Sequence, residues 1–135
     1  MASSPQVQIR RACDATEQSW SSPQRGAVNW WELFGGDVTP TSDLTLGIAE
    51  IPPHSPIPTR GHTHDAVEVY VIMAGRGSVY VDGIFYPVND GDAVWIPEHA
   101  EHFVRNDGDQ AVRLLYIFAR DKFSDVHYCF PGEDI

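Results

Sequence analysis

The chain has 135 residues, of which 42% are hydrophobic, and a formal net charge of −10 at pH 7. This length fits one domain with a core of its own, and the acidic balance argues against a nucleic-acid or anionic-membrane surface. No apolar run approaches the ~20 residues of a membrane span, and "MASSPQVQIRRACDATEQSW" lacks the apolar segment of a signal peptide. We therefore expect a cytoplasmic protein with no membrane partner, in which Cys13 and Cys129 are free thiols.

Short β-branched and aromatic runs, separated by turn signals, follow one another along the chain. The first forty residues are expected to hold an extra strand and a covering segment, with at most one turn of helix near residue 17. The later runs span residues 43–51, 66–73, 77–88, 92–97, 102–106 and 111–119. Evenly spaced short strands of this kind are typical of an antiparallel sandwich or barrel.

The run over 77–88 contains Asp82-Gly83, a pair that favours a two-residue hairpin because both residues tolerate positive φ angles. The whole pattern predicts one all-β domain in three parts. These are an N-terminal extension over 1–40, a barrel over 41–125 and a C-terminal tail over 126–135.

Ionisable side chains are concentrated in "RGHTHDAVEVYVIMAG", residues 60–75. Because strand side chains alternate between two faces, Arg60, His62 and His64 share a face if this segment is extended. Glu68, Tyr70 and Ile72 would share a face of the following strand. Two imidazoles and a carboxylate at this spacing suit a divalent transition metal.

A fourth candidate ligand, His102, lies in "GDAVWIPEHAEHFVRN" after a turn. We predict that four residues bind one divalent metal ion: His62, His64, Glu68 and His102. Iron, manganese, cobalt, nickel and zinc all accept such ligands.

These residues resemble the two motifs of the cupin superfamily. The first, His-x-His, three or four residues, Glu, six residues and Gly, stands here as His62, His64, Glu68 and Gly75. The second, Gly, five residues, Pro, x, Gly, two residues, His, three residues and Asn, stands here as Gly91, Pro97, His99, His102 and Asn106. His99 replaces a glycine of the second motif, and Pro56 replaces one expected before the first. The resemblance implies a jelly-roll barrel that binds a metal.

A narrower resemblance is to the short single-domain cupin lyases that cleave dimethylsulfoniopropionate. It rests on "HTHDAVEVYVI", on "GDAVWIPEHAEHFVRNDG" and on the tail "LLYIFARDKFSDVHYCFPG". The group has a tyrosine two residues after the glutamate ligand, matched by Tyr70, and a second one near the C-terminus, matched by Tyr128. It implies that Tyr70 is the base of a β-elimination that yields dimethyl sulfide and acrylate.

Other residues are candidates for contact with a small carboxylate substrate. Arg60 would bind the carboxylate, and the aromatic faces of Trp30, Tyr116 and Tyr128 would bind a sulfonium cation. Trp30 and Trp31 cannot both point inward from one strand.

Three alternatives to a lyase remain at this point: an oxygen-dependent dioxygenase, a biosynthetic or catabolic isomerase, cyclase or decarboxylase, and a non-catalytic ligand-binding barrel. We also expect a homodimer, because an extra N-terminal strand in a small cupin often pairs with a second subunit.

Overall fold

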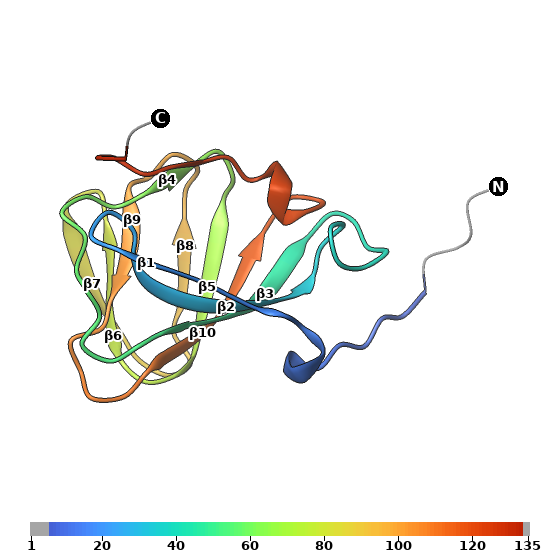
Figure 1. The fold of residues 1–135 in the computed structure, drawn as a ribbon, viewed down its shortest axis with the longest axis horizontal. Coiled ribbons are helices and arrows are strands. Elements are labelled where there is room, and N and C mark those ends of the chain that lie inside the picture. Colours follow the sequence, from blue (N-terminus) through green and yellow to red (C-terminus); the bar gives the residue numbers. More distant parts are fainter. Residues whose placement is uncertain (1–5, 134–135) are drawn as a thin grey trace.

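Two antiparallel sheets surround a common core in the computed structural model, which describes residues 6–133 (Figure 1). The six-stranded sheet has the order β1-β2-β3-β10-β5-β8, and the three-stranded sheet has the order β7-β6-β9. A small third sheet pairs β11 with β4. The elements are η1 (Ala12–Asp14), β1 (Glu17–Ser22), β2 (Gly26–Phe34), β3 (Thr45–Ile51), β4 (Thr63–His64), β5 (Glu68–Ala74), β6 (Gly77–Val81), β7 (Ile84–Val88), β8 (Ala93–Ile96), β9 (His102–Arg105), β10 (Val112–Phe118), η2 (Phe123–Asp125) and β11 (Tyr128–Cys129).

Alternation along the central strands builds the core. On β10 every second residue, from Val112 to Phe118, is buried, and the residues between them are half-buried on the outer face. Strand β5 alternates in the same way from Glu68 to Ile72 and pairs with β10 so that Tyr70 lies opposite Tyr116. Polar and aromatic side chains of both strands therefore point to the barrel interior.

All six predicted runs contain strands, and the hairpin between β6 and β7 is confirmed. Asp82 and Gly83 have φ angles of 47° and 93°, as a two-residue turn with positive φ at both positions requires. The structure assigns both cysteines as free and exposed. No helix among residues 6–133 is long and apolar enough to cross a membrane.

The one helical turn that the sequence allowed near residue 17 does not form there. Strand β1 begins at Glu17, and a 3-10 turn lies just before it over Ala12–Asp14. Six residues of β1 pair with β2, so ladder hydrogen bonds override the weak local preference for a helix.

The N-terminal region contributes two strands rather than one. The β1–β2 hairpin extends the six-stranded sheet beyond β3 and crosses the front of the barrel in Figure 1. On β2, Trp30 is buried against the core, whereas Trp31 is half-buried on the opposite face. The extremities of the predicted extension and tail, residues 1–5 and 134–135, lie outside the described residues.

The hairpin turn gives a test of local backbone preference. A Cβ atom on Gly83 would meet nothing within 4 Å, so a substitution there changes conformational energy rather than packing. We expect Gly83→Val to lower the free energy of unfolding by about 1–2 kcal/mol, measured by urea denaturation. Gly83→Asn is the control, because asparagine tolerates positive φ, and an equal loss in both variants would contradict this explanation.

Candidate metal centre

A close contact between two backbone segments forms the floor of the site. The His62 N–H donates to the His102 carbonyl at 3.1 Å, and the His102 N–H donates to the His62 carbonyl at 2.9 Å. A Cβ atom on Gly61 would lie 2.7 Å from the His102 nitrogen, so glycine permits this approach. The two motifs, about forty residues apart in sequence, are thereby held side by side.

Three imidazoles converge above this contact. One ring nitrogen from each of His62, His64 and His102 lies within 4.8 Å of the others. Glu68 joins them from β5, with its Oε1 3.1 Å from the Nε2 atoms of both His64 and His102. The structure thus brings all four predicted ligands together.

Hydrogen bonds to the backbone set the tautomer of two of these rings. Nδ1 of His64 lies 2.8 Å from the Ala66 carbonyl, and Nδ1 of His102 lies 2.8 Å from the Ala100 carbonyl. A carbonyl can only accept, so each Nδ1 carries a hydrogen and each ring turns its Nε2 atom to the interior.

The three imidazoles and the Glu68 carboxylate meet in a space that is shielded from solvent. Burial would raise the pKa of Glu68, but its contacts with the imidazoles of His102 and His64 lower that pKa below its ordinary value, so the carboxylate is ionised. Burial, followed by electrostatic repulsion from His102 and His64, holds the pKa of His62 well below its usual range. Three imidazoles and one carboxylate are a donor set that fits a divalent transition metal, which would take the place of any Nε2 hydrogens when it binds.

A cavity of about 80 Å³ adjoins the ligand set. Its polar wall includes His62 and Glu68, and most of the remaining wall is aromatic or aliphatic. The aromatic side chains that line it are Trp20, Trp30, Tyr70, Phe103, Tyr116, Phe118, Phe123 and Tyr128. One water needs about 10–15 Å³ on this measure, so the cavity matches a short molecule of a few heavy atoms.

The predicted base and aromatic contacts lie in this lining. Tyr70 is buried on the inner face of β5, two residues beyond Glu68, with its ring 6.3 Å from that of His102. Trp30 and Tyr116 each carry a buried polar atom, Nε1 and the hydroxyl, that has no hydrogen-bond partner among residues 6–133. Such atoms are available to a bound ligand.

Tyr128 reaches the site from the C-terminal tail. Its ring centroid lies 5.3 Å from that of His62 and 5.0 Å from that of His64, and its strand β11 pairs with β4. Burial raises the pKa values of Tyr70 and Tyr128 well above that of a free phenol, and the charge of Glu68 adds to the effect in both.

Arg60 does not join the ligands, so the prediction that it shares their face is wrong. The chain bends at residues 59 and 60 instead of continuing as a strand. The Arg60 side chain is 62% exposed, donates to Glu101 and does not line the cavity. The anion that Arg60 contacts is the Glu101 carboxylate of the chain, not a carboxylate bound in the cavity.

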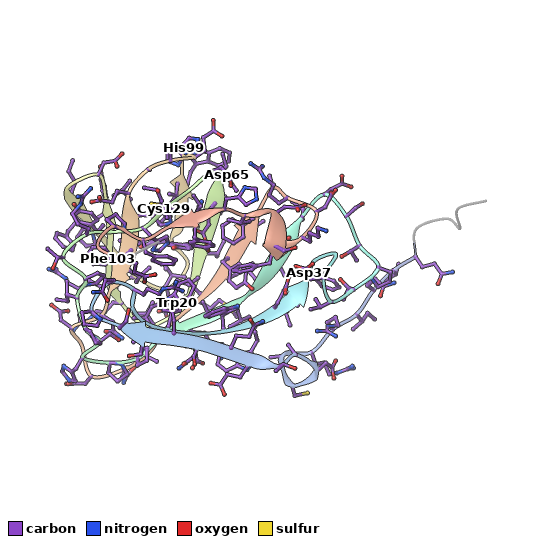
Figure 2. The ribbon with its side chains drawn as sticks, turned by 45° about the horizontal axis from the view of Figure 1, so that its top comes forward. Trp20, Asp37, Asp65, His99, Phe103 and Cys129 are labelled. Carbon is purple, nitrogen blue, oxygen red and sulfur yellow. The ribbon has the colours of Figure 1, made fainter. Side chains whose placement is uncertain are left out.

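Sequence reasoning predicted Tyr128 at the cavity but missed the two aromatic residues that pack against it, Trp20 and Phe130. Trp20, Tyr128 and Phe130 form an aromatic roof, with ring centroids 5.2–5.8 Å apart in each pair. Figure 2 shows the tail with Cys129 crossing the barrel beside Trp20. Arg25, in the β1–β2 turn, lines the cavity and lies against the rings of Trp20 and Phe130. None of these residues except Tyr128 belongs to a motif, and β1 carries no apolar alternation that would have revealed Trp20.

Comparisons with known proteins agree with this geometry. A family model described as a cupin domain matches residues 47–118. The chain is 34% identical over 112 residues to the dimethylsulfoniopropionate lyase DddW of Ruegeria pomeroyi, covering 83% of this chain and 72% of that protein.

Solved structures share the fold. The polyketide cyclase RemF of Streptomyces resistomycificus has a TM-score of 0.72 at 18% identity, over 96% of this chain and 89% of that one. The cupin-2 domain protein Rru_A2000 of Rhodospirillum rubrum has a TM-score of 0.68 at 24% identity, over 96% of this chain and 84% of that one. At these identities the likeness concerns the fold.

The ligand assignment predicts the metal content of variants. We expect His62→Ala to lower the bound metal from about one ion per chain to a small fraction of that, because one of four donors is lost. The measurement is elemental analysis after gel filtration. His54→Ala is the matched control, because His54 is exposed and pairs with Asp109 outside the cavity. Equal metal content in both variants would remove His62 from the ligand set.

Proposed function

This chain belongs to the cupin domain family, and from that premise we propose that it is a metal-dependent carbon–sulfur lyase acting on a small carboxylate substrate. The leading substrate is dimethylsulfoniopropionate, which a β-elimination would convert to dimethyl sulfide and acrylate. The observation that carries the proposal is the place of Tyr70, which lines the cavity beside the Glu68 carboxylate on the ligand side of the barrel. A phenol in this position is a candidate base for an α proton.

Three further observations support this substrate class. The relative DddW, 34% identical to this chain, is named for this reaction. The cavity, about 80 Å³, suits a short substrate. Its aromatic wall, which includes Trp30, Phe123 and Tyr128, offers π faces to an onium group, each worth roughly 0.5–2 kcal/mol.

The ligand set and the phenol have complementary roles in this proposal. Bound by His62, His64, Glu68 and His102, a divalent cation supplies positive charge that attracts a carboxylate, acidifies the adjacent C–H bond and favours a nearby phenolate. The chain lowers the pKa values of His62 and Glu68, and it orients the rings of His64 and His102 through hydrogen bonds to backbone carbonyls.

Tyr70 performs the proton transfer. Its phenolate oxygen accepts the α proton, the C–H electron pair becomes the new C=C bond, and the Cβ–S bond breaks with its electron pair leaving on sulfur. Burial and the negative charge of Glu68 raise the pKa of Tyr70 in this structure. A cation bound by Glu68 would compensate that negative charge and so lower the pKa of Tyr70. The aromatic roof excludes water from the same space, which protects the carbanion-like transition state from a competing proton.

Headspace detection of dimethyl sulfide tests the activity. Metal-replete protein is expected to release it from dimethylsulfoniopropionate, and Tyr70→Phe is expected to lower kcat by about 100-fold or more while metal content stays the same. Tyr86→Phe is the control, because Tyr86 is an exposed tyrosine on β7 outside the cavity. Full activity of the Tyr70→Phe variant would exclude Tyr70 as the base, and no dimethyl sulfide from the unaltered protein would exclude the substrate.

Dependence on oxygen separates elimination from the oxygenase alternative. Elimination consumes no oxidant, so we expect the same rate of acrylate formation in an anaerobic chamber as in air. An oxygen electrode provides the complementary measurement, with no uptake above background during turnover. Stoichiometric oxygen uptake would contradict the lyase and favour a dioxygenase with the same ligands.

A further inference from the structure

Arg25 is a positively charged side chain in the cavity wall. It lies in the turn between β1 and β2 and, among residues 6–133, is the only arginine or lysine in the cavity lining. Its Cζ atom lies 3.9 Å from the ring centroid of Phe130 and 5.3 Å from that of Trp20. Stacking on two rings of the aromatic roof holds the guanidinium plane in place.

The guanidinium is already bound to a carboxylate from the chain itself. Arg25 donates from Nε to Oε2 of Glu133 at 2.6 Å and from Nη2 to Oε1 at 3.0 Å. This two-point contact has the geometry with which an arginine binds a free carboxylate. The two side chains are 33% and 30% exposed, so the pair lies where the cavity meets solvent.

Phe130 lies between this guanidinium and one of the predicted ligands in the series of ring contacts. Phe130, on which it stacks, has its ring centroid 5.5 Å from that of His62. The guanidinium and the His62 imidazole therefore lie against the same aromatic ring.

Glu133 can leave without dismantling the roof. Tyr128 and Phe130 remain in place through the β11–β4 pairing and their mutual stacking at 5.5 Å. Replacing one carboxylate on Arg25 with another preserves the local charge, and a partly exposed ion pair is weak enough to exchange.

We propose that Arg25 is the carboxylate-binding residue of the cavity and that Glu133 is an internal competitor which occupies it until a substrate carboxylate arrives. Arg25 thus takes the role that the sequence had indicated for Arg60. The proposal deepens the proposed function but requires only a carboxylate ligand, whatever reaction follows.

Binding of propanoate, which cannot undergo the elimination, tests the proposal independently of turnover. The dissociation constant is measured by chemical-shift titration of the zinc-loaded protein. We expect Arg25→Gln to raise it by about ten-fold, because a charge-assisted two-point contact is lost. We expect Glu133→Gln to lower it by about three-fold, because the competing carboxylate is removed.

The surface pair Arg60–Glu101 supplies matched controls, since it is a comparable arginine–glutamate contact outside the cavity. Arg60→Gln and Glu101→Gln should leave propanoate binding unchanged, and propanamide should bind all variants alike. In the Arg25→Gln background, Glu133→Gln should have no further effect.

Two results would overturn the proposal. Unchanged propanoate affinity in Arg25→Gln would show that Arg25 does not bind the ligand. Weaker binding in Glu133→Gln would show that Glu133 positions Arg25 instead of competing with the ligand. If the unaltered protein makes no dimethyl sulfide but the variants show the expected propanoate affinities, the lyase proposal fails and the proposal for Arg25 stands.

Discussion

The paired backbone hydrogen bonds between His62 and His102 are the contact on which the rest of the site depends. They fix the distance between β4 and β9 and so set how closely the imidazoles approach. The other edge of β4 carries β11, which holds Tyr128 over the cavity. A strand of two residues thus connects the predicted metal ligands on one side with the aromatic roof on the other. Gly61 makes the contact possible because no side chain intervenes.

Burial of Glu68 imposes the second constraint. An ionised carboxylate in an apolar interior is costly unless a positive charge or donors compensate it. Here the Nε2 atoms of His64 and His102 each lie 3.1 Å from the carboxylate oxygen, and contacts of their Nδ1 atoms with backbone carbonyls orient both rings. Two imidazoles therefore compensate the Glu68 carboxylate in this structure, and a divalent cation bound by the same side chains would take over that compensation. Metal affinity and folding stability are expected to be coupled for this reason.

Much of the fold and the ligand set follows from the sequence, because both depend on short-range patterns. Alternation over 66–73 and 111–119 places β5 and β10 correctly, and Asp82-Gly83 specifies its hairpin. The cavity's outer wall does not follow in this way. Trp20 and Phe130 meet only through tertiary packing, and Arg60 turns outward because the chain bends before His62. Even the departure at His99 is accommodated, since this residue adopts a φ of 65° with its side chain in solvent.

The division between motif and roof has a consequence for how this protein family can diversify. The residues that would hold a metal come from the middle of the chain, whereas Trp20, Arg25 and Phe130 come from segments near its two ends. Substitutions in those terminal segments can change which ligands the cavity binds without altering the residues that would hold the metal. A library confined to the β1–β2 turn and the tail would therefore explore new ligand preferences on a constant reactive centre.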